Sequence, residues 1–88
     1  MVEKEFVVPN RLGLHARPAA LFVNEAARFR STITVNKDGL EINGKSVMGL
    51  MLLAAEHGSR LKVKADGEDE VAAMEALGAI FARKFDED

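Results

Sequence analysis

Two side chains that could handle a phosphoryl group stand close together near the start of the chain. They are His15 and Arg17, within the stretch GLHARPAA from Gly13 to Ala20. An imidazole nitrogen can accept a group covalently and release it again. A guanidinium binds phosphate oxygens in a bidentate manner. Metal binding is a poorer interpretation, because no carboxylate or second histidine lies at metal-ligand spacing from His15.

The pair stands at the expected start of a helix. Residues 16–29 repeat apolar side chains at helical spacing, and Pro18 would lie in the first turn, where its missing N–H costs little. The first N–H groups of a helix have no partner inside it and attract anions, helped by the helix dipole. The stretch therefore predicts a phosphate site, although a lone histidine at a helix start is more often just an exposed polar residue.

A second candidate is Ser46, which precedes the apolar run of residues 47–53. Serine is a preferred N-cap residue, so Ser46 is expected to begin a short helix that ends near residues 57–58. Its hydroxyl beside Lys45 is also a candidate for phosphorylation. Phosphate would add about −1.5 to −2 charges at a helix N-terminus, which should not unfold the protein.

The stretch GLEINGKS, residues 39–46, matches the pattern of a nucleotide-binding P-loop. Its context argues against that interpretation. Gly39 follows Asp38, and Asp-Gly predicts a hairpin turn. Residues 40–43 are then expected to form a strand and not a flexible loop that wraps phosphate.

The helix after Ser46 is apolar around most of its circumference. A helix that covers one side of a sheet should bury a single stripe, here Leu50, Leu53 and Ala54. The remaining apolar residues are then partly left to solvent, and methionine-rich exposed surfaces suit the docking of several partners. These residues are Val47, Met48, Met51 and Leu52. A core contact wider than one stripe is the alternative.

The rest of the chain supplies four strands and a third helix. Alternating or short apolar runs predict strands over residues 2–8, 32–37, 40–43 and 60–66, with Ile33, Val35, Leu40 and Ile42 facing inward.

Asp69 is expected to cap a helix whose apolar stripe is Val71, Met74, Leu77, Gly78, Phe81 and Phe85. Residues 86–88 are expected to fray. The order β-α-β-β-α-β-α predicts an α+β fold, an antiparallel sheet with helices on one face and water on the other.

Composition narrows the class of protein. The 88 residues predict one domain, 1–88, and the absence of cysteine fits a reducing cytosol. A net charge of −2 argues against a nucleic-acid binder. The N-terminus does not resemble a signal peptide, and no apolar stretch is long enough to span a bilayer. We therefore expect a cytoplasmic protein without direct membrane insertion.

Three segments together closely resemble the HPr family, the histidine-containing phosphocarrier proteins of the bacterial phosphoenolpyruvate-dependent phosphotransferase system. They are residues 13–20, residues 43–51 (NGKSVMGLM) and residues 65–70 (ADGEDE), and the resemblance extends over essentially the whole chain. It implies an open-faced β-sandwich of four antiparallel strands under three helices. It also implies no cofactor and no metal.

The resemblance implies a role for each candidate residue. His15 would take a phosphoryl group at Nδ1 from enzyme I and pass it to the A domains of sugar permeases. Arg17 and the backbone N–H groups of Ala16 and Arg17 would hold that group. A dedicated ATP-dependent kinase/phosphorylase would modify Ser46 and weaken docking to enzyme I. The docking surface would comprise Ala20, Val47, Met48, Met51 and Leu52.

Other functions remain open at this point. The main alternative is a regulatory binding module, of the nitrogen branch or one in which phosphorylated Ser46 recruits a transcriptional regulator. The presence of His15 argues against a related regulatory subclass that lacks the histidine. A small hydrolase is disfavoured because no orienting acid stands near His15 in the sequence. We expect a monomer, since the one apolar surface must stay free.

Overall fold

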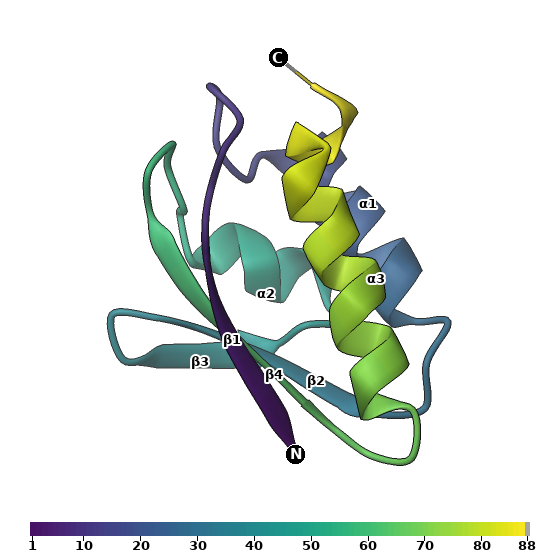
Figure 1. Ribbon diagram of the computed structural model, residues 1–88. Helices are drawn as coiled ribbons and strands as arrows, with labels where there is room; N and C mark the ends of the chain where they lie inside the picture. Colours follow the sequence, from purple (N-terminus) through teal and green to yellow (C-terminus); the bar gives the residue numbers. More distant parts are fainter. Residues whose placement is uncertain (88) are drawn as a thin grey trace.

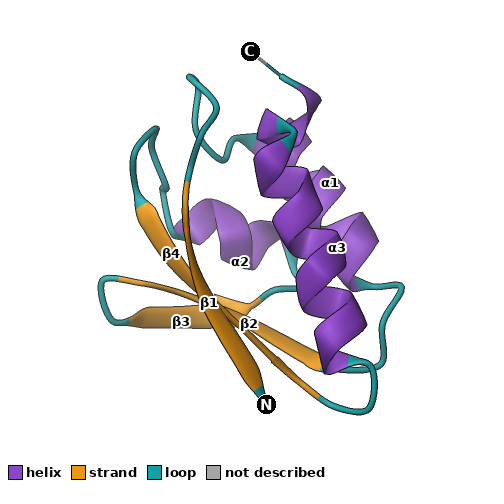
Figure 2. Cartoon of the chain, in the orientation of Figure 1, coloured by secondary structure: helices purple, strands orange, loops and turns teal. Residues whose placement is uncertain are grey.

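The computed structural model describes residues 1–87, which form a four-stranded sheet and three helices (Figures 1 and 2). The strands are β1 (Val2–Val7), β2 (Thr32–Lys37), β3 (Leu40–Asn43) and β4 (Arg60–Asp66). The helices are α1 (Ala16–Ala26), α2 (Val47–Leu52) and α3 (Glu70–Ala82). The predicted order β-α-β-β-α-β-α and the antiparallel sheet covered on one face by the helices are confirmed.

The sheet has the strand order β1-β4-β2-β3, and all its pairings are antiparallel. The central strands lie in register with Val35 opposite Val63. The turn between β2 and β3 has positive φ at both central residues, 52° at Asp38 and 90° at Gly39. The backbone of such a turn matches the right-handed twist of the two strands that it joins. The hairpin predicted from Asp38-Gly39 is confirmed.

The core lies between the helices and one face of the sheet. Alternate side chains of β2 and β4 point into it, because successive residues of a strand face opposite sides. The largest fully buried side chains of this core are Phe22, Ile33, Leu50, Leu61, Leu77 and Ile80. Polar side chains cover the other face of the sheet, as the alternation predicts.

The outermost strand departs from the prediction for Leu40. Ile33 and Val35 are buried and Ile42 packs against the core, but half of Leu40 is exposed. β3 is an edge strand, and Leu40 stands at its start beside the hairpin turn. Leu40 therefore stays half exposed at the edge of the sheet, whereas Ile42 packs against the core.

All three helices end earlier than their apolar periodicity predicts, and α3 ends at Ala82, before Phe85 of its expected stripe. α1 stops at Ala26, and Arg28 and Phe29 then form i→i+3 hydrogen bonds to Glu25 and Ala26. α2 stops at Leu52, not near residue 57. Ala54 adopts a left-handed backbone, φ 49°, which ends a helix. Ala54 is consequently exposed and does not belong to the buried stripe of α2.

Asp69 precedes α3 but caps it differently from the prediction. Its side chain forms no hydrogen bond with its own helix. It accepts instead from the backbone N–H groups of Arg30 and Ser31, at 2.8 and 3.0 Å, and from the buried Ser31 hydroxyl. These bonds lower the pKa of Asp69 from 3.8 to about 2, with the Ser31 hydroxyl the largest cause. Asp69 thus ties the start of α3 to the loop before β2.

Fraying is expected over residues 86–88, but Asp86 and Glu87 form backbone hydrogen bonds to Arg83 and Lys84. α3 ends at Ala82, and a single turn, Lys84–Asp86, follows. Phe85 is buried and Glu87 is half-buried. Asp88 lies outside the described residues. Within α3, Val71 was placed in the apolar stripe but is exposed, because it stands in the first turn beyond the core.

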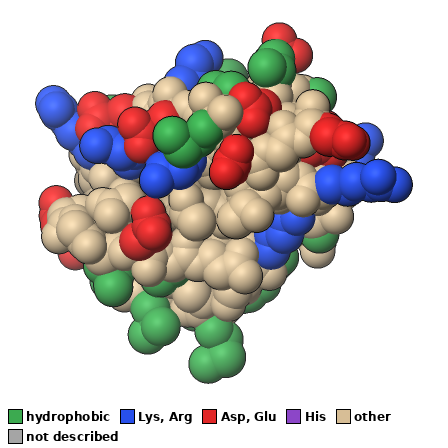
Figure 3. Space-filling model, turned by 90° about the horizontal axis from the view of Figure 1, so that it is seen from below, with side chains coloured by type: hydrophobic (Ala, Val, Ile, Leu, Met, Phe, Trp, Pro, Cys, Tyr) green, Lys and Arg blue, Asp and Glu red, His purple; other side chains and the backbone are tan. Residues whose placement is uncertain are grey.

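The two ends of the described chain lie at opposite ends of the molecule (Figure 1). The end that holds the N-terminus is seen in Figure 3, where acidic and basic side chains are mixed and no histidine is visible. No helix within residues 1–87 is long and apolar enough to cross a membrane.

Candidate functional site

His15 is the N-cap residue of α1, as the sequence predicts. Its backbone is extended, with φ −74° and ψ −174°, and its side chain makes no cap hydrogen bond. The side chain is 38% exposed. The helix has no acidic residue in its first turn, and Pro18 there has no N–H. Ala16 and Arg17 are the first two residues of the helix, so their N–H groups have no partner within it. Both residues are exposed.

The segment before His15 is held by the loop that follows α2. The N–H of Leu14 donates to the carbonyl oxygen of Ala55 at 2.9 Å, and the Leu14 side chain is buried. Gly13 has φ +73°, and a Cβ atom there would come within 2.5 Å of the same Ala55 oxygen. Only glycine fits this position, so the glycine of the GLHARPAA stretch sets where His15 stands.

The imidazole of His15 contacts a carboxylate. Its Nε2 lies 3.2 Å from Oε1 and 3.1 Å from Oε2 of Glu87. A carboxylate accepts hydrogen bonds, so Nε2 carries the proton and Nδ1 of the neutral ring keeps its lone pair. No hydrogen bond to Nδ1 is found within residues 1–87. The argument that no acid stands near His15 is thus wrong, because the acid comes from the far end of the chain.

Two hollows flank this contact. One of about 650 Å³ is lined by His15, Met51 and His57 among others. The other, about 330 Å³, is lined by Arg11, Leu12, Arg17, Asp86 and Glu87. Arg17 thus lies beside the tail that contacts His15.

Sequence reasoning missed Arg11, Leu12 and Glu87. Arg11 and Leu12 belong to both hollows, and Leu12 is a largely exposed apolar side chain close before His15. The sequence does offer a signal for Leu12, because it is an apolar residue outside the predicted strands and helices and just before a candidate site. Glu87 gave no such signal, because its approach depends on the turn that follows α3.

Ser46 caps α2 as predicted. Its side chain accepts a hydrogen bond from the Gly49 N–H at 3.0 Å, and the residue is half-buried. Residues 40–43 of the P-loop pattern form β3, and Gly39 lies in the hairpin turn. The pattern GLEINGKS is therefore not a P-loop, as its context indicated.

The surface of α2 divides into a buried and an exposed side. Leu50 and Leu53 are buried as predicted. Met48 is 78% exposed and Leu52 71% exposed, and Met51 is also exposed. Val47 is only half exposed and packs against the core. Of the four apolar residues of α2 expected at the surface, only Val47 therefore fits the alternative of a core contact wider than one stripe.

The exposed side of α2 adjoins the histidine. Met51 and His15 line the same hollow, and α2 packs beside α1. Ala20, on α1, is half-buried. An apolar surface thus borders the half-exposed imidazole.

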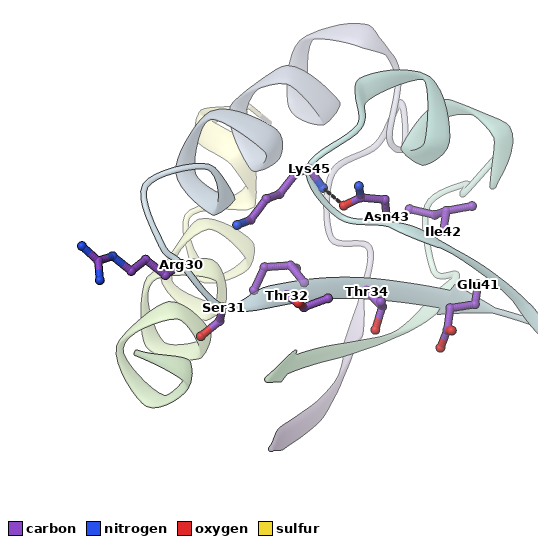
Figure 4. Close-up of a pocket in the computed structure, with 9 residues that line it drawn as sticks. Arg30, Ser31, Thr32, Thr34, Glu41, Ile42, Asn43 and Lys45 are labelled. Carbon is purple, nitrogen blue, oxygen red and sulfur yellow. Dashed lines mark hydrogen bonds between the residues drawn. The ribbon is translucent and has the colours of Figure 1, made fainter. Parts of the chain in front are cut away.

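A further pocket of about 450 Å³ lies at the other end of α1, between Arg30, Thr34 and Asn43 (Figure 4). Arg30 points outward from it in Figure 4. The Lys45 ammonium donates to the Phe29 carbonyl at 2.7 Å, just beyond the last turn of α1. Of the basic groups that line this pocket, Arg30 therefore points away and the Lys45 ammonium is bound to the backbone.

The described residues contain no group of three or more histidine, aspartate and glutamate side chains that could hold a metal ion. Neither of the hollows beside His15 is lined by a serine, threonine or lysine within the part of the chain that the structure describes.

Comparison with known proteins agrees with this geometry. A family model described as "PTS HPr component phosphorylation site" matches residues 2–83. The chain belongs to the HPr family. The phosphocarrier protein HPr of Xylella fastidiosa is 49% identical over 88 residues, which is 100% of this chain and 99% of that protein. The HPr-like protein Crh of Halalkalibacterium halodurans is 52% identical over 84 residues, 96% of this chain and 100% of that protein.

Solved structures of HPr proteins share the fold. A crystal structure of HPr from Thermoanaerobacter tengcongensis has a TM-score of 0.96 and 45% identity, covering 100% of this chain and 99% of that one. A structure of an HPr dimer from the same organism has a TM-score of 0.78 and 46% identity, covering 97% and 98%. This chain is thus an HPr-family phosphocarrier of the phosphotransferase system.

Proposed function

We propose that His15 is the residue through which this chain carries the phosphoryl group, accepting it from enzyme I and passing it to the A domains of sugar permeases. The observation that carries the proposal is the position of a half-exposed imidazole at the N-cap of an 11-residue helix, with its Nε2 engaged and its Nδ1 unbonded within residues 1–87. Nδ1 is then the nucleophile. Membership of the HPr family supports the same assignment.

The transfer needs little beyond positioning and charge. The Nδ1 lone pair forms the new bond to phosphorus, and the bond from phosphorus to the donor breaks with its electron pair on the donor. The N–H groups of Ala16 and Arg17 and the positive end of the α1 dipole face the incoming oxygens. The Arg17 guanidinium, which lines the hollow beside Glu87, adds a fixed positive charge.

Docking would use the apolar surface next to His15. It comprises Ala20, Val47, Met48, Met51 and Leu52, and adjoins the hollow that Met51 shares with His15. Flexible methionine side chains adapt to different partners, which a carrier that serves both a donor and several acceptors requires.

Ser46 would act as a regulatory site. A dedicated ATP-dependent kinase/phosphorylase would phosphorylate its hydroxyl, which stands at the start of α2, two positions before Met48 in the chain. A phosphate oxygen could still accept from the Gly49 N–H, so the helix would persist. The added charge would lie within the apolar docking surface, and binding to enzyme I should weaken.

The test is incubation with phosphoenolpyruvate and enzyme I. Wild-type protein should gain an acid-labile phosphate, and His15→Ala should gain none. Equal labelling of His15→Ala would overturn the assignment. With ATP and the serine kinase, an acid-stable phosphate should form that Ser46→Ala lacks.

A regulatory module remains the second candidate, favoured by the 52% identity to an HPr-like Crh protein. In that function a transcriptional regulator would bind the Ser46-phosphorylated form. Labelling by enzyme I followed by transfer to an A domain discriminates the two functions. A module that only regulates would not pass a phosphoryl group to an A domain.

We infer that the protein works in the cytoplasm as a monomer, where its docking surface is free. The HPr dimer of Thermoanaerobacter tengcongensis makes this worth measuring. Sedimentation at micromolar concentration should give a mass near 9.6 kDa. Twice that mass, with slower labelling at higher protein concentration, would refute the monomer.

A further inference from the structure

Glu87 and His15 are joined although 72 positions separate them in the sequence. Both oxygens of the Glu87 carboxylate lie within 3.2 Å of His15 Nε2. The Glu87 side chain is only 17% exposed, against 38% for His15. A half-exposed histidine therefore has a more buried acid behind it. The family match ends at residue 83, so this acid lies beyond it.

Asn10 holds the carboxylate in place. Its Nδ2 donates to Glu87 Oε1 at 2.9 Å and to the Gly13 carbonyl at 2.6 Å. Asn10 is fully buried, and its Oδ1 has no partner among residues 1–87. Because both neighbours accept hydrogen bonds, the amide must present its NH₂ group to them. One buried side chain thus joins the tail to the segment that leads to His15.

The backbone of the tail is bent toward the site at a cost in free energy. Lys84, Phe85 and Asp86 have φ values of 55°, 54° and 58°, in the left-handed region that non-glycine residues rarely adopt. Three such residues in a row persist only where their surroundings hold them. Phe85 provides that hold, because it is buried and its ring meets Phe81 edge-on at 4.9 Å.

Other charged groups surround the pair but do not replace Glu87 at the ring. Those that line the two hollows are Arg11, Arg17, Glu56, His57 and Asp86. Among the described residues, the ion pair of Asp86 is with Arg83, and that of His15 is with Glu87. The charge that acts directly on Nε2 is therefore the Glu87 carboxylate.

We propose that Glu87 is a positioning residue for phosphoryl transfer: it binds the Nε2 proton of His15 and stabilises the positive charge that the ring gains when Nδ1 bonds to phosphorus. The inference rests on the proposed role of His15. The proton stays on Nε2 throughout, the Nδ1 lone pair forms the P–N bond, and the donor keeps the electrons of the bond that breaks. Glu87 also favours the return step, because a ring kept cationic is the better leaving group.

The test compares Glu87→Ala and Glu87→Gln with a control, Glu75→Gln. Glu75 is an exposed acid on α3 and lines neither hollow beside His15. Hydrogen bonds to charged groups are the stronger ones, so we expect transfer from enzyme I to slow roughly tenfold in both Glu87 variants. Glu75→Gln should transfer at the wild-type rate.

A second readout separates this role from a purely structural one. The isolated phosphoprotein should hydrolyse with a pH profile displaced to lower pH in both Glu87 variants, because the ring loses its Nε2 proton more readily without the carboxylate. Ring ¹⁵N spectra should show the Nε2–H tautomer retained in Glu87→Gln and partly lost in Glu87→Ala. Glutamine keeps an acceptor without the charge.

The outcomes distinguish the two proposals. Labelling that persists in His15→Ala would overturn the proposed function. Labelling lost in His15→Ala, together with wild-type rates and an unchanged pH profile in both folded Glu87 variants, would overturn only the role of Glu87. Circular dichroism of each variant establishes that it is folded.

Discussion

Leu14 donates its backbone N–H to the carbonyl oxygen of Ala55 at 2.9 Å, which fixes the residue before His15 to the residue three positions after α2. The candidate site is therefore assembled from segments that the chain brings together only once α2 and α1 are packed. Figure 1 shows the loop before α1, the loop after α2 and the C-terminal turn at the same end of the molecule.

Gly13→Ala should disturb both stability and transfer. Alanine is strained at φ +73°, and its Cβ would lie 2.5 Å from the Ala55 oxygen, so the loop must move. We expect a loss of at least about 2 kcal/mol in the free energy of unfolding. Urea denaturation measures the loss, and labelling by enzyme I should slow because His15 shifts.

Gly39→Ala is the matched control for this effect. Gly39 has φ +90° but no atom within 4 Å of an added Cβ, and it lies in the β2–β3 turn away from His15. It should lose about 1 kcal/mol from backbone strain alone and keep the wild-type labelling rate. An equal slowing of transfer in both variants would show that instability, and not the Ala55 contact, controls the rate.

Ser46→Ala should destabilise the protein by about 1 kcal/mol, since the Gly49 N–H loses its acceptor at the start of α2. Ser46→Asp should cost less, because aspartate is also a good cap. Chemical denaturation of the three proteins orders them. A Ser46→Ala protein as stable as the wild type would mean that water replaces the cap.

Met48→Asp should weaken binding to enzyme I at least roughly tenfold while leaving the fold intact, since the side chain is 78% exposed and makes no core contact. Titration calorimetry measures the affinity. Val71→Asp is the control, because Val71 is an apolar residue on α3 that is 61% exposed and lies outside the proposed surface. Unchanged affinity in Met48→Asp would remove α2 from the docking surface.

Acid should destabilise the protein in a pH range set by Asp69. Its pKa is lowered to about 2 in the folded protein from an ordinary 3.8. The ionised carboxylate stabilises the fold above the unfolded pKa, and this contribution is lost as the pH falls from about 4 to about 2. Asp69→Asn should therefore be less stable at pH 6 and show a flatter decline over that range. Parallel curves for both proteins would exclude Asp69 as the cause.

Most of the secondary structure could be predicted because local signals agree with the final packing. The alternation in β2 and β4, the Asp38-Gly39 turn and the Ser46 cap are all properties of neighbouring residues. Helix ends were less predictable. α2 stops where Ala54 turns left-handed, and alanine gives no sign of that conformation in a sequence.

Only those residues of the site that lie close together in the chain could be predicted from the sequence. His15, Arg17 and the helix start follow from one octapeptide, whereas Glu87 reaches His15 through a turn of three left-handed residues that no local pattern indicates. The side chain of Asp69 was likewise expected to bind its own helix and binds Ser31 instead. Contacts between distant segments are what periodicity cannot supply.

The sheet pairing has a consequence for how the protein folds. Among the described strands β1 pairs only with β4, so Val2 must find Ala65 across most of the chain, and the Leu14–Ala55 bond closes a second, shorter loop. Closing such loops precedes the gain from contacts, which predicts refolding in about milliseconds to seconds, not microseconds. Stopped-flow measurements can check this rate. During synthesis, the imidazole would then acquire its full surroundings only after Glu87 has left the ribosome.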